Sequence, residues 1–444
     1  MFRLITVQEP RISFYLGEDW NPRRIIKLKP FTYMALKDQE IVLKVLTDVE
    51  TEKLTVKMVN KLINGYRGSY YFYPPFIDVY GMQIRFDEKE GVTHIDEGSA
   101  FSKLEEVADS IIETNSPGII MLSTRGLPSS VYRRVKLRII ARYSKKNLRT
   151  QFVNKQRIND LMDKSGFEFF LLNLATAIYA KAGGTPWKLS RSLVETRGLI
   201  IGISFARRKE ERGDEVIYYG AVELLDRYGE HLFTRMKMFI GSRRKVETKG
   251  LYVPYENMVD LLENAIKQYG APPLLIIHKS SPFVEDEEIK AINDVLGKYS
   301  GRGIQIALIA VHVKRNVIYR LFDTDAKDYS PARGYLLVDE GGSAIHRGII
   351  LFTTGRLQGE DSRKKLGTPK PIELDVIANT MGKTKPEWLA KQVLGLTKLD
   401  WNTTEPEIRI PITIKYSNKA AKLASYILAQ ELPDLLIGDI RDLM

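Results

Sequence analysis

The chain has 444 residues, of which 44% are hydrophobic and 27% charged, an ordinary composition for a globular protein of two or three domains. Its 67 Lys and Arg outnumber its 55 Asp and Glu, and the net charge of +12 favours a polyanionic partner such as nucleic acid. It has no cysteine, which excludes disulfides, Cys-ligated zinc and Cys nucleophiles, and its five histidines lack ligand spacing.

The chain shows no sign of membrane insertion. Its first residues lack the apolar core of a signal peptide, and no apolar run reaches the roughly 20 residues of a membrane span. We expect an intracellular, cytoplasmic protein that does not itself enter a membrane.

Residues 1–37 are predicted to form an N-terminal extended segment. From residue 38 to 182, strand-like and helix-like stretches alternate, which is typical of a Rossmann-like α/β domain with a parallel sheet. Residues 117–124 read as a buried strand, 150–154 as a second strand and 167–187 as an apolar helix. Ligands of such domains bind beyond the carboxyl ends of the strands.

A basic stretch follows the first of these strands. Residues 132–151 contain eight Lys and Arg and no acid, and the first half has the apolar spacing of a helix. Tyr132 and Lys136 are one turn apart on one helical face, and a phenol beside an ammonium group suits a phosphate. A solvated basic face is the alternative reading of such a run.

The pattern changes in residues 183–444. Three consecutive strands between 197 and 240 are followed by a helix at 255–270, a strand at 274–279, a helix at 285–299 and a strand at 304–311. This is the order of an RNase H-like fold. Further strands are expected at NVIYRLF, GYLLVDE, GIILFTT and ELDVI, helices near 385–396 and 417–431, and a long loop at 354–370.

A Rossmann-like domain followed by an RNase H-like domain resembles the MID–PIWI half of Argonaute proteins. The segment Ala-Lys-Ala-Gly-Gly-Thr-Pro-Trp at 180–187 is similar to the family's junction between MID and PIWI, and Arg333-Gly334-Tyr335 resembles the PIWI interior. The length leaves no room for the N and PAZ domains before MID, so the chain resembles a short prokaryotic, archaeal-type Argonaute. The resemblance implies a MID domain at 38–182 and a catalytically degenerate PIWI domain at 183–444.

The resemblance also implies a pocket for the 5′ phosphate of a guide strand. Its residues in order are Tyr132, Lys136, Gln151, Asn173 and Lys181. Two lysines would offset the phosphate charge, while the phenol and carboxamides would give directional hydrogen bonds. By the family pattern, the C-terminal carboxylate of Met444 would share Mg²⁺ or another divalent cation with the phosphate, in a structural role.

The nuclease site appears degenerate by the same resemblance. RNase H-like nucleases hold two metal ions between carboxylates, whereas the corresponding positions here fall on Ser204, Ser280 and Asn418, with Glu247 near the place of an additional glutamate. Serine is a poor Mg²⁺ ligand, so no catalytic residue and no target cleavage are expected. The alternative is an active Mg²⁺-dependent endonuclease that uses the nearby acids Glu210, Glu211 and Glu285 to Glu288.

Basic residues of the second domain are candidates for a duplex channel, namely Arg207, Arg208, Arg235, Lys237, Arg243, Arg244, Lys314 and Arg315. The implied function is to load a short 5′-phosphorylated guide and to recognise a complementary target by base pairing. We expect an RNA guide and a DNA target, although no motif codes that choice. Short family members act in defence against invading nucleic acid, so associated effector proteins, including a membrane-linked one, are expected to dock at 1–37 or 354–370. A sequence-independent nucleic-acid-binding protein is the third reading.

Overall fold

The computed structural model describes residues 2–124, 127–162, 164–212, 214–339, 348–357, 359–363, 365, 367–382, 384–426 and 434–444. Within these ranges the side chains of 129, 144, 155, 157, 208–212 and 434–436 are left undescribed. The chain forms two compact units, of which unit 1 comprises 1–11, 189–399 and 407–440, and unit 2 comprises 12–188, 400–406 and 441–444. The N-terminal segment expected at 1–37 is therefore divided between the units. None of the helices in the described ranges is long and apolar enough to cross a membrane.

Unit 2 is built on a parallel sheet in the order β10-β9-β4-β7, with β8 also paired to β4. Its strands are β2 Ile12–Phe14, β3 Gly17–Asp19, β4 Glu40–Thr47, β5 Tyr66–Arg67, β6 Phe72–Tyr73, β7 Gln83–Arg85, β8 Val92–His94, β9 Gly118–Ser123 and β10 Leu148–Phe152. Its helices are η1 Pro22–Arg24, α1 Ile25–Leu28, α2 Tyr33–Leu36, α3 Val49–Asn64, α4 Phe76–Tyr80, α5 Ala100–Ile112, α6 Ser129–Tyr143, η2 Ser144–Lys146, α7 Lys155–Leu161 and α8 Phe167–Lys181.

The hydrophobic pattern explains why these elements form. All six residues of β9 are buried, as expected for a central parallel strand. Helix α6 packs Val131, Val135 and Ile139, which are one turn apart, into the same core as α5. The α/β organisation of this unit is therefore as predicted, while residues 22–36, expected as extended, contain three short helical elements.

Unit 1 holds a sheet in the order β1-β17-β18-β19-β16-β15-β12-β13-β14-β20. Its strands are β1 Phe2–Thr6, β12 Gly198–Arg212, β13 Glu215–Leu225, β14 His231–Ser242, β15 Leu274–Lys279, β16 Ala307–Lys314, β17 Tyr335–Asp339, β18 Ile349–Leu351, β19 Ile372–Asn379 and β20 Asp434–Ile437. Its helices are α9 Arg243–Lys249, α10 Tyr255–Tyr269, the π-helical η3 Glu285–Ile289, α11 Lys290–Ser300, α12 Pro386–Leu396, η4 Thr397–Leu399 and α13 Ile412–Ala424. Strand β11 Lys188–Leu189 and η5 Ile440–Asp442 cross the unit boundaries.

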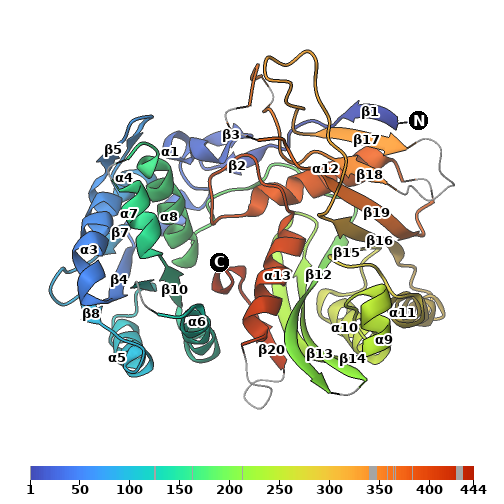
Figure 1. Ribbon diagram of the computed structural model, residues 1–444, viewed down its shortest axis with the longest axis horizontal. Coiled ribbons are helices and arrows are strands. Elements are labelled where there is room, and N and C mark those ends of the chain that lie inside the picture. The colour runs from blue at the N-terminus through green and yellow to red at the C-terminus, as the bar shows by residue number, and fades with distance from the viewer. Residues whose placement is uncertain are drawn as a thin grey trace. The chain divides into compact units, whose positions relative to one another are not determined.

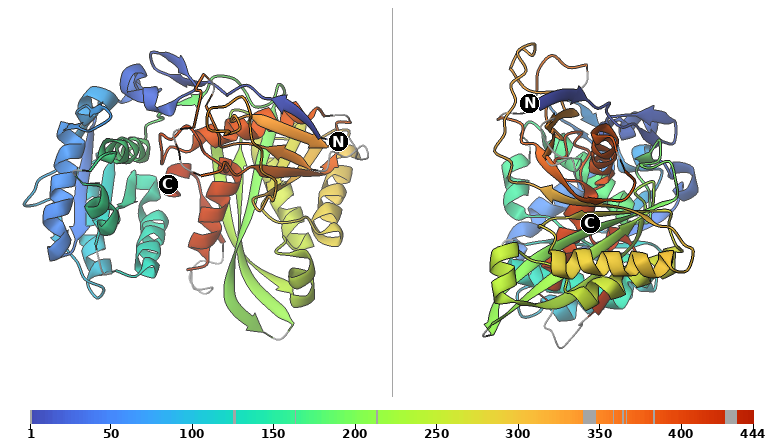
Figure 2. Two further views of the ribbon diagram at one scale, coloured as in Figure 1. Left: turned by 45° about the horizontal axis from the view of Figure 1, so that its top comes forward. Right: turned by 90° about the vertical axis from the view of Figure 1, so that its right-hand side faces the viewer.

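The sheet of unit 1 has the predicted RNase H-like order, with β12, β13 and β14 antiparallel and β12, β15 and β16 parallel. Helices α10 and α11 share a core with the strands on one side, and α13 lies on the opposite face (Figures 1 and 2). One predicted strand is wrong, because NVIYRLF at 316–322 forms an irregular segment. Val317 is buried and Leu321 packs beside it, whereas Ile318 is 86% exposed and Phe322 is 67% exposed, so only part of this segment is covered.

Arg333 anchors the interior of unit 1. It is fully buried, and its Nε donates to both carboxylate oxygens of Glu9 at 2.9 and 3.0 Å. Its other nitrogens donate to Thr397 Oγ1 at 2.7 Å and to the main-chain oxygen of Thr353. Burial alone would raise the pKa of Glu9, but Arg333 and Lys398 beside it bring that pKa below its usual value. The segment that contains β1 is thereby fixed within unit 1.

Candidate nucleic-acid interface

The carboxyl ends of β9 and β10 carry the candidate phosphate pocket of unit 2. Tyr132, in the first turn of α6, shares a hydrogen bond with Thr124 Oγ1, just beyond β9, and lies 3.3 Å from the Thr124 main-chain oxygen. Its ring meets the Phe152 ring edge-on, with the centroids 5.2 Å apart. The phenol is thus held at the strand ends, where a Rossmann-like sheet binds its ligand.

Lys181 and Gln151 meet in the same region from different elements. The Lys181 ammonium group, at the end of α8, donates to Gln151 Oε1 and to the main-chain oxygen of Thr150, both at 2.8 Å. The carboxamide of Gln151, on β10, donates in turn to the main-chain oxygen of Phe152 at 3.0 Å. Lys181 is 2% exposed, so this cation is buried and fixed rather than a solvated charge at a helix end.

The last residues, 441–444, belong to the same unit. Lys136 donates to the main-chain oxygen of Met444, whose side chain is buried. Arg149 Nε donates to Asp442 Oδ1 at 2.8 Å, and both side chains are only 4% exposed. Arg149 also donates to the main-chain oxygen of Lys181 at 2.7 Å. This buried pair, which sequence reasoning missed, fastens residues 441–444 to β10 and α8.

Asn173, the fifth predicted pocket residue, bonds to Thr404. Its Oδ1 accepts hydrogen bonds from the Thr404 main-chain nitrogen at 2.7 Å and from Thr404 Oγ1 at 2.8 Å. Eight residues of helix separate Asn173 from Lys181, which is about 12 Å along the axis. The structure therefore gives Asn173 a role in holding residues 400–406, within unit 2.

The oxygen atoms of the pocket that could ligate a metal ion do not form a metal site. Gln151 Oε1 accepts from Lys181, Met444 accepts from Lys136, and Asp442 is paired with Arg149. Among the described residues, no group of three or more His, Asp or Glu side chains could hold a metal ion. The protein donors alone do not fit a Mg²⁺ ion, and the expected cation stays a prediction.

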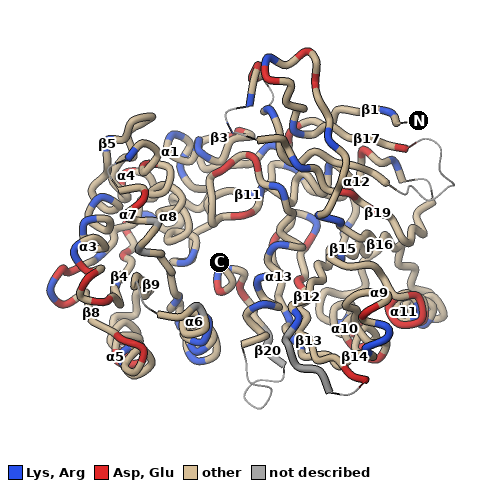
Figure 3. Tube along the Cα trace, in the orientation of Figure 1, with Lys and Arg blue, Asp and Glu red and all other residues tan. Residues whose placement is uncertain are grey.

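Electrostatics set the pocket apart from its surroundings. Figure 3 shows α6 as a helix rich in Lys and Arg and without acids, beside α5, which carries acids. Arg138 and Arg142 on the outer side of α6 both pair with Glu105 of α5, at 2.6 and 2.5 Å. The outer basic face is thus partly neutralised, whereas Lys136 contacts Met444 and Arg149 contacts both Asp442 and the main chain of Lys181.

In unit 1, the positions expected to be degenerate lie where α13 meets the sheet. Ser204 of β12 is fully buried, and its hydroxyl lies 2.8 Å from the Ser417 hydroxyl on α13. The Ser280 main-chain nitrogen donates to the Ile203 oxygen at 3.0 Å, so Ser280 stands next to Ser204. The hydrogen bonds that join Ser204 to α13 involve Ser417 and the main-chain oxygen of Ile414, while Asn418 is half-buried. Glu247 is exposed on α9.

Two further buried groups lie beside the serines, and sequence reasoning missed both. Glu223 and His278 stand opposite Gly202 on the two neighbouring strands. Neither carboxyl oxygen of Glu223 makes a hydrogen bond, and burial raises its pKa well above the usual value, an effect that the nearby Ser417 N–H partly offsets. Burial lowers the pKa of His278 to about 4, and its Nδ1 lies 3.1 Å from Thr413 Oγ1.

The proposed channel residues differ in their surroundings. Lys314 pairs with Glu373 at 2.8 Å and Asp375 at 3.2 Å, so its charge is neutralised within the fold. Arg235 lines a cavity of about 380 Å³ beside α10. Lys237 and Arg243 are half-buried and Arg207 and Arg244 are exposed, while the side chain of Arg208 lies outside the described residues.

Arg315 belongs to an arginine cluster that sequence reasoning did not find. Arg409 Nη2 donates to the Pro371 oxygen at 2.9 Å and also to the Arg315 oxygen, while Arg320 Nη1 donates to the Val317 oxygen at 2.7 Å. Burial lowers the pKa of Arg409, and the charges of Arg315 and Arg320 lower it further. The side chains of Arg320 and Arg409 donate to main-chain oxygens, which carry no charge, so the cluster has the charge to bind an anion.

Comparison with known proteins agrees with this fold. The family model described as "Piwi domain" matches residues 128–429. The Argonaute proteins of Cereibacter sphaeroides and Aquifex aeolicus are each 24% identical, over 277 and 285 residues, or 59% and 63% of this chain. These matches cover only 34% and 35% of those two proteins, so the chain corresponds to about a third of their length.

Solved structures resemble nearly the whole chain. The Clostridium butyricum Argonaute bound to a guide DNA and a 19-mer target DNA has a TM-score of 0.66 at 17% identity, with 98% of this chain and 54% of that one covered. The A. aeolicus Argonaute has a TM-score of 0.63 at 17% identity, with 99% and 55% covered. These similarities establish the α/β fold with an RNase H-like domain, and the match over residues 128–429 establishes the family. The chain is a member of the Piwi-domain family and is similar in structure to a prokaryotic Argonaute over 98% of its length.

Proposed function

We propose that this chain binds the 5′ phosphate of a short guide strand in unit 2 and presents that strand for pairing with a complementary target. The observation that carries the proposal is the meeting of Lys181 and Gln151 at 2.8 Å, in the same unit as Tyr132 and Lys136. Cationic and neutral donors at the ends of parallel strands suit a terminal phosphate, which is doubly charged and accepts several hydrogen bonds. The structural relative from C. butyricum holds a guide and a target DNA.

The proposal is tested by direct binding measurements. Strands of one sequence, with either a 5′ phosphate or a 5′ hydroxyl, are compared on the wild-type chain and on Lys136→Ala. The wild type is expected to prefer the phosphorylated strand, and the variant is expected to lose that preference. Equal binding of both strands by the wild type would favour a sequence-independent nucleic-acid-binding protein instead.

The same proposal holds that the chain recognises its target without cleaving it. Ser204 and Ser417 donate and accept hydroxyl hydrogen bonds where carboxylates would have to hold metal ions. Hydroxyl groups lack the charge that binds Mg²⁺ ions in two-metal nucleases. A guide-loaded chain is expected to retain its target intact in the presence of Mg²⁺ or Mn²⁺.

The alternative of an active nuclease built from nearby acids has little structural support. Glu288 is fully buried and paired with Lys279 at 2.8 Å. Glu287 and Asp286 both pair with Lys245, at 2.5 and 2.7 Å. The side chains of Glu210 and Glu211 lie outside the described residues. Cleavage of a matched target that disappears on Glu287→Gln would restore this alternative.

The arginine cluster of Arg315, Arg320 and Arg409 supports the nucleic-acid part of the proposal for unit 1. Exposed rings of Tyr319 and Phe322 lie in the same segment as two of these arginines, and arginines with aromatic rings suit a nucleic-acid strand. Arg320→Ala is expected to weaken binding of guide and target and to reduce its salt dependence. Lys314→Ala is the matched control, because Lys314 is already paired with two carboxylates.

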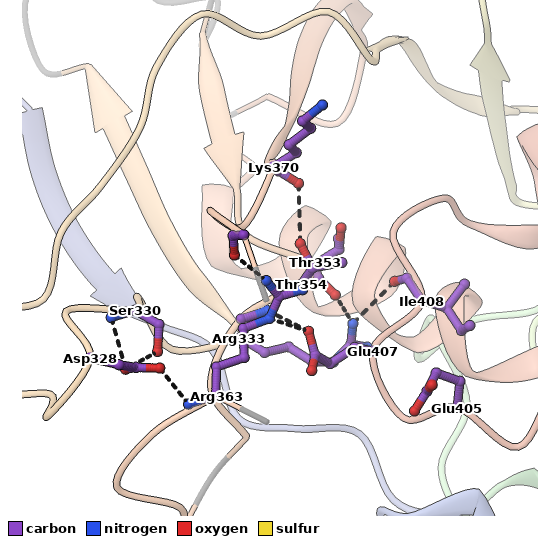
Figure 4. Close-up of polar contacts among 12 residues, drawn as sticks. Asp328, Ser330, Arg333, Thr353, Thr354, Arg363, Lys370, Glu405, Glu407 and Ile408 are labelled. Carbon is purple, nitrogen blue, oxygen red and sulfur yellow. Dashed lines mark hydrogen bonds and ion pairs between the residues drawn. The ribbon is translucent and has the colours of Figure 1, made fainter. Parts of the chain in front are cut away.

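Without cleavage, recognition of a target requires another protein to respond, and we propose that an associated effector protein binds this chain. We also propose an RNA guide and a DNA target. Residues 12–37 are the better docking candidate, since Tyr15, Leu16 and Met34 are exposed there at 45%, 59% and 54%. The loop at 354–370 is pinned by Arg363, whose Nε donates to Glu407 Oε2 at 2.8 Å and whose main-chain nitrogen donates to Asp328 (Figure 4). Retention of the effector by a Leu16→Asp/Met34→Asp variant would argue against docking at 12–37.

A further inference from the structure

A second polar surface of unit 2 lies along α3, separate from the phosphate pocket. A groove of about 580 Å³ is lined by three lysines, two acids and four other residues, namely Lys53, Lys57, Lys61, Glu52, Glu88, Val56, Asn60, Asn64 and Gly65. The three lysines are each one turn apart on one face of α3, so their ammonium groups are spread over about 12 Å of helix. Charges spread in this way suit a chain of phosphates better than a single anion.

The acids of this groove are engaged by neighbouring side chains. Glu52 lies 2.8 Å from His94 Nε2, and Glu88 accepts from the Asn60 carboxamide at 2.7 Å. Lys53 and Lys57 are exposed, whereas Lys61 is half-buried with its ammonium group over the Tyr66 ring, 4.3 Å from the centroid. The groove therefore exposes Lys53 and Lys57, while Lys61 contacts the hairpin that begins at Tyr66.

That hairpin, formed by β5 and β6, displays aromatic rings. Tyr70 is 69% exposed and Phe72 is 51% exposed. The Tyr70 ring lies 5.6 Å from the Phe169 ring, and the Arg23 guanidinium group lies 4.3 Å from that ring on α8. The result is a short series of contacting groups, with the two rings tilted by 45°, that ends in an exposed tyrosine.

Glu168 holds the hairpin in this position. It is fully buried at the start of α8, and its Oε1 accepts from the Tyr70 main-chain nitrogen at 2.8 Å. Its main-chain oxygen accepts from the Tyr71 hydroxyl at 2.9 Å. A Cβ atom at Gly68 would lie 2.3 Å from the Glu168 carboxyl group, so the turn fits closely over that side chain. The exposed rings are thus displayed on a fixed support.

From these observations we infer that the α3 groove and the β5–β6 hairpin bind a single-stranded stretch of nucleic acid, with phosphates along Lys53 and Lys57 and a base stacked on Tyr70. Backbone neutralisation together with base–aromatic stacking is the usual basis of sequence-independent single-strand binding. Hairpin and groove are continuous, because Asn64 ends α3 and Tyr66 begins β5 (Figure 1). This site would hold a strand independently of its 5′ end.

The test uses the full chain with Lys136→Ala as background, a 5′-hydroxyl single-stranded oligonucleotide and fluorescence anisotropy over a salt series. Lys53→Glu/Lys57→Glu is expected to weaken binding and to reduce the slope of log K against log salt by about 1.4, or 0.7 for each phosphate. Tyr70→Leu keeps an apolar side chain but removes the flat ring, and it is expected to lower affinity by about five- to 150-fold.

Lys27→Glu/Lys37→Glu makes the same charge change at exposed positions outside the groove. An equal loss in this control would overturn the inference, since long-range charge alone would explain the binding.

An oligonucleotide carrying 5-iodouracil is expected to crosslink to the peptide that contains Tyr70. Crosslinks confined to other peptides, with Tyr70→Leu unchanged, would also overturn it and would indicate a protein-docking role for the hairpin. Because the preference for a 5′ phosphate is measured separately on chains with an intact Lys136, either proposal can fail alone.

Discussion

The ammonium group of Lys181 lies 2.8 Å from the carboxamide oxygen of Gln151, although the two residues come from a helix and a strand that are 30 positions apart. The contact orients the Gln151 carboxamide, whose nitrogen donates to the Phe152 oxygen. It also keeps a buried cation within hydrogen-bonding distance of the strand ends where Tyr132 stands. A phosphate would meet groups that are already in position, which lowers the ordering cost of binding.

Lys181→Met is expected to weaken binding of a 5′-phosphorylated strand by about ten- to 150-fold, because a hydrogen bond to a charged group contributes roughly 1.5–3 kcal/mol. Binding of the 5′-hydroxyl strand is expected to change much less. Competition binding with the two strands measures the ratio, and thermal unfolding of the variant shows whether the fold is kept. Parallel losses for both strands would mean that Lys181 only supports the local structure.

Glu223→Gln is expected to stabilise the chain at neutral and alkaline pH. The pKa of Glu223 is raised in the folded state, so the folded chain holds a proton that the unfolded chain releases. The proton bound by Glu223 therefore stabilises the folded chain fully below the usual carboxyl pKa. This stabilisation is lost as pH rises from the usual carboxyl pKa toward the pKa of the folded state. Unfolding temperatures of both chains measured from pH 5 to pH 8 should diverge in favour of Glu223→Gln as pH rises. A constant difference across this range would contradict the prediction.

Ser204→Asp/Ser280→Asp/Asn418→Asp is not expected to restore target cleavage. Ser204 is fully buried against Ser417, and a Cβ atom at the nearby Gly202 would lie only 2.1 Å from the Thr413 oxygen, so α13 leaves no room there for metal ions. An ionised carboxylate buried at 204 should instead lower the unfolding temperature. The measurement combines a Mg²⁺-dependent cleavage assay with thermal unfolding, and Asn418→Asp alone serves as the control. Cleavage by the triple variant would show that α13 moves to admit the metal ions.

Lys279→Met is expected to destabilise unit 1 by about 3–5 kcal/mol, because it leaves Glu288 as a buried charge without its cation. The two groups are 2.8 Å apart and fully buried. Burial lowers the pKa of Lys279 and raises that of Glu288, and the attraction between the two charges opposes both shifts. Chemical denaturation of Lys279→Met and of Lys279→Met/Glu288→Leu measures the effect, and the double variant should recover part of the loss. A double variant less stable than the single one would show that Glu288 acts mainly through its bonds to the Val253 and Val284 main-chain nitrogens.

The order of helices and strands along the chain can largely be predicted from the sequence. The apolar run at 117–124, the periodic helix at 255–270 and the apolar run at 274–279 each appear in the structure at nearly the predicted bounds, because a buried face imposes its period on the sequence. The same local pattern failed at 316–322, where Val317 is buried but Ile318 and Phe322 face solvent and no strand forms. Hydrophobic periodicity shows that a segment can bury one face, but it does not show whether another element packs against that face.

The pocket required both levels. Sequence spacing placed Tyr132 and Lys136 on one helical face, and the family resemblance selected Gln151 and Lys181. The pairing of Arg149 with Asp442 and the hydrogen bond between Asn173 and Thr404 can be seen only in the folded chain. The same is true of the neutralisation of Lys314 by Glu373 and Asp375. These contacts join residues that are distant in sequence. Burial changes the energy of an ion pair and the pKa of a carboxyl group such as that of Glu223, and burial arises only when helices and strands pack together.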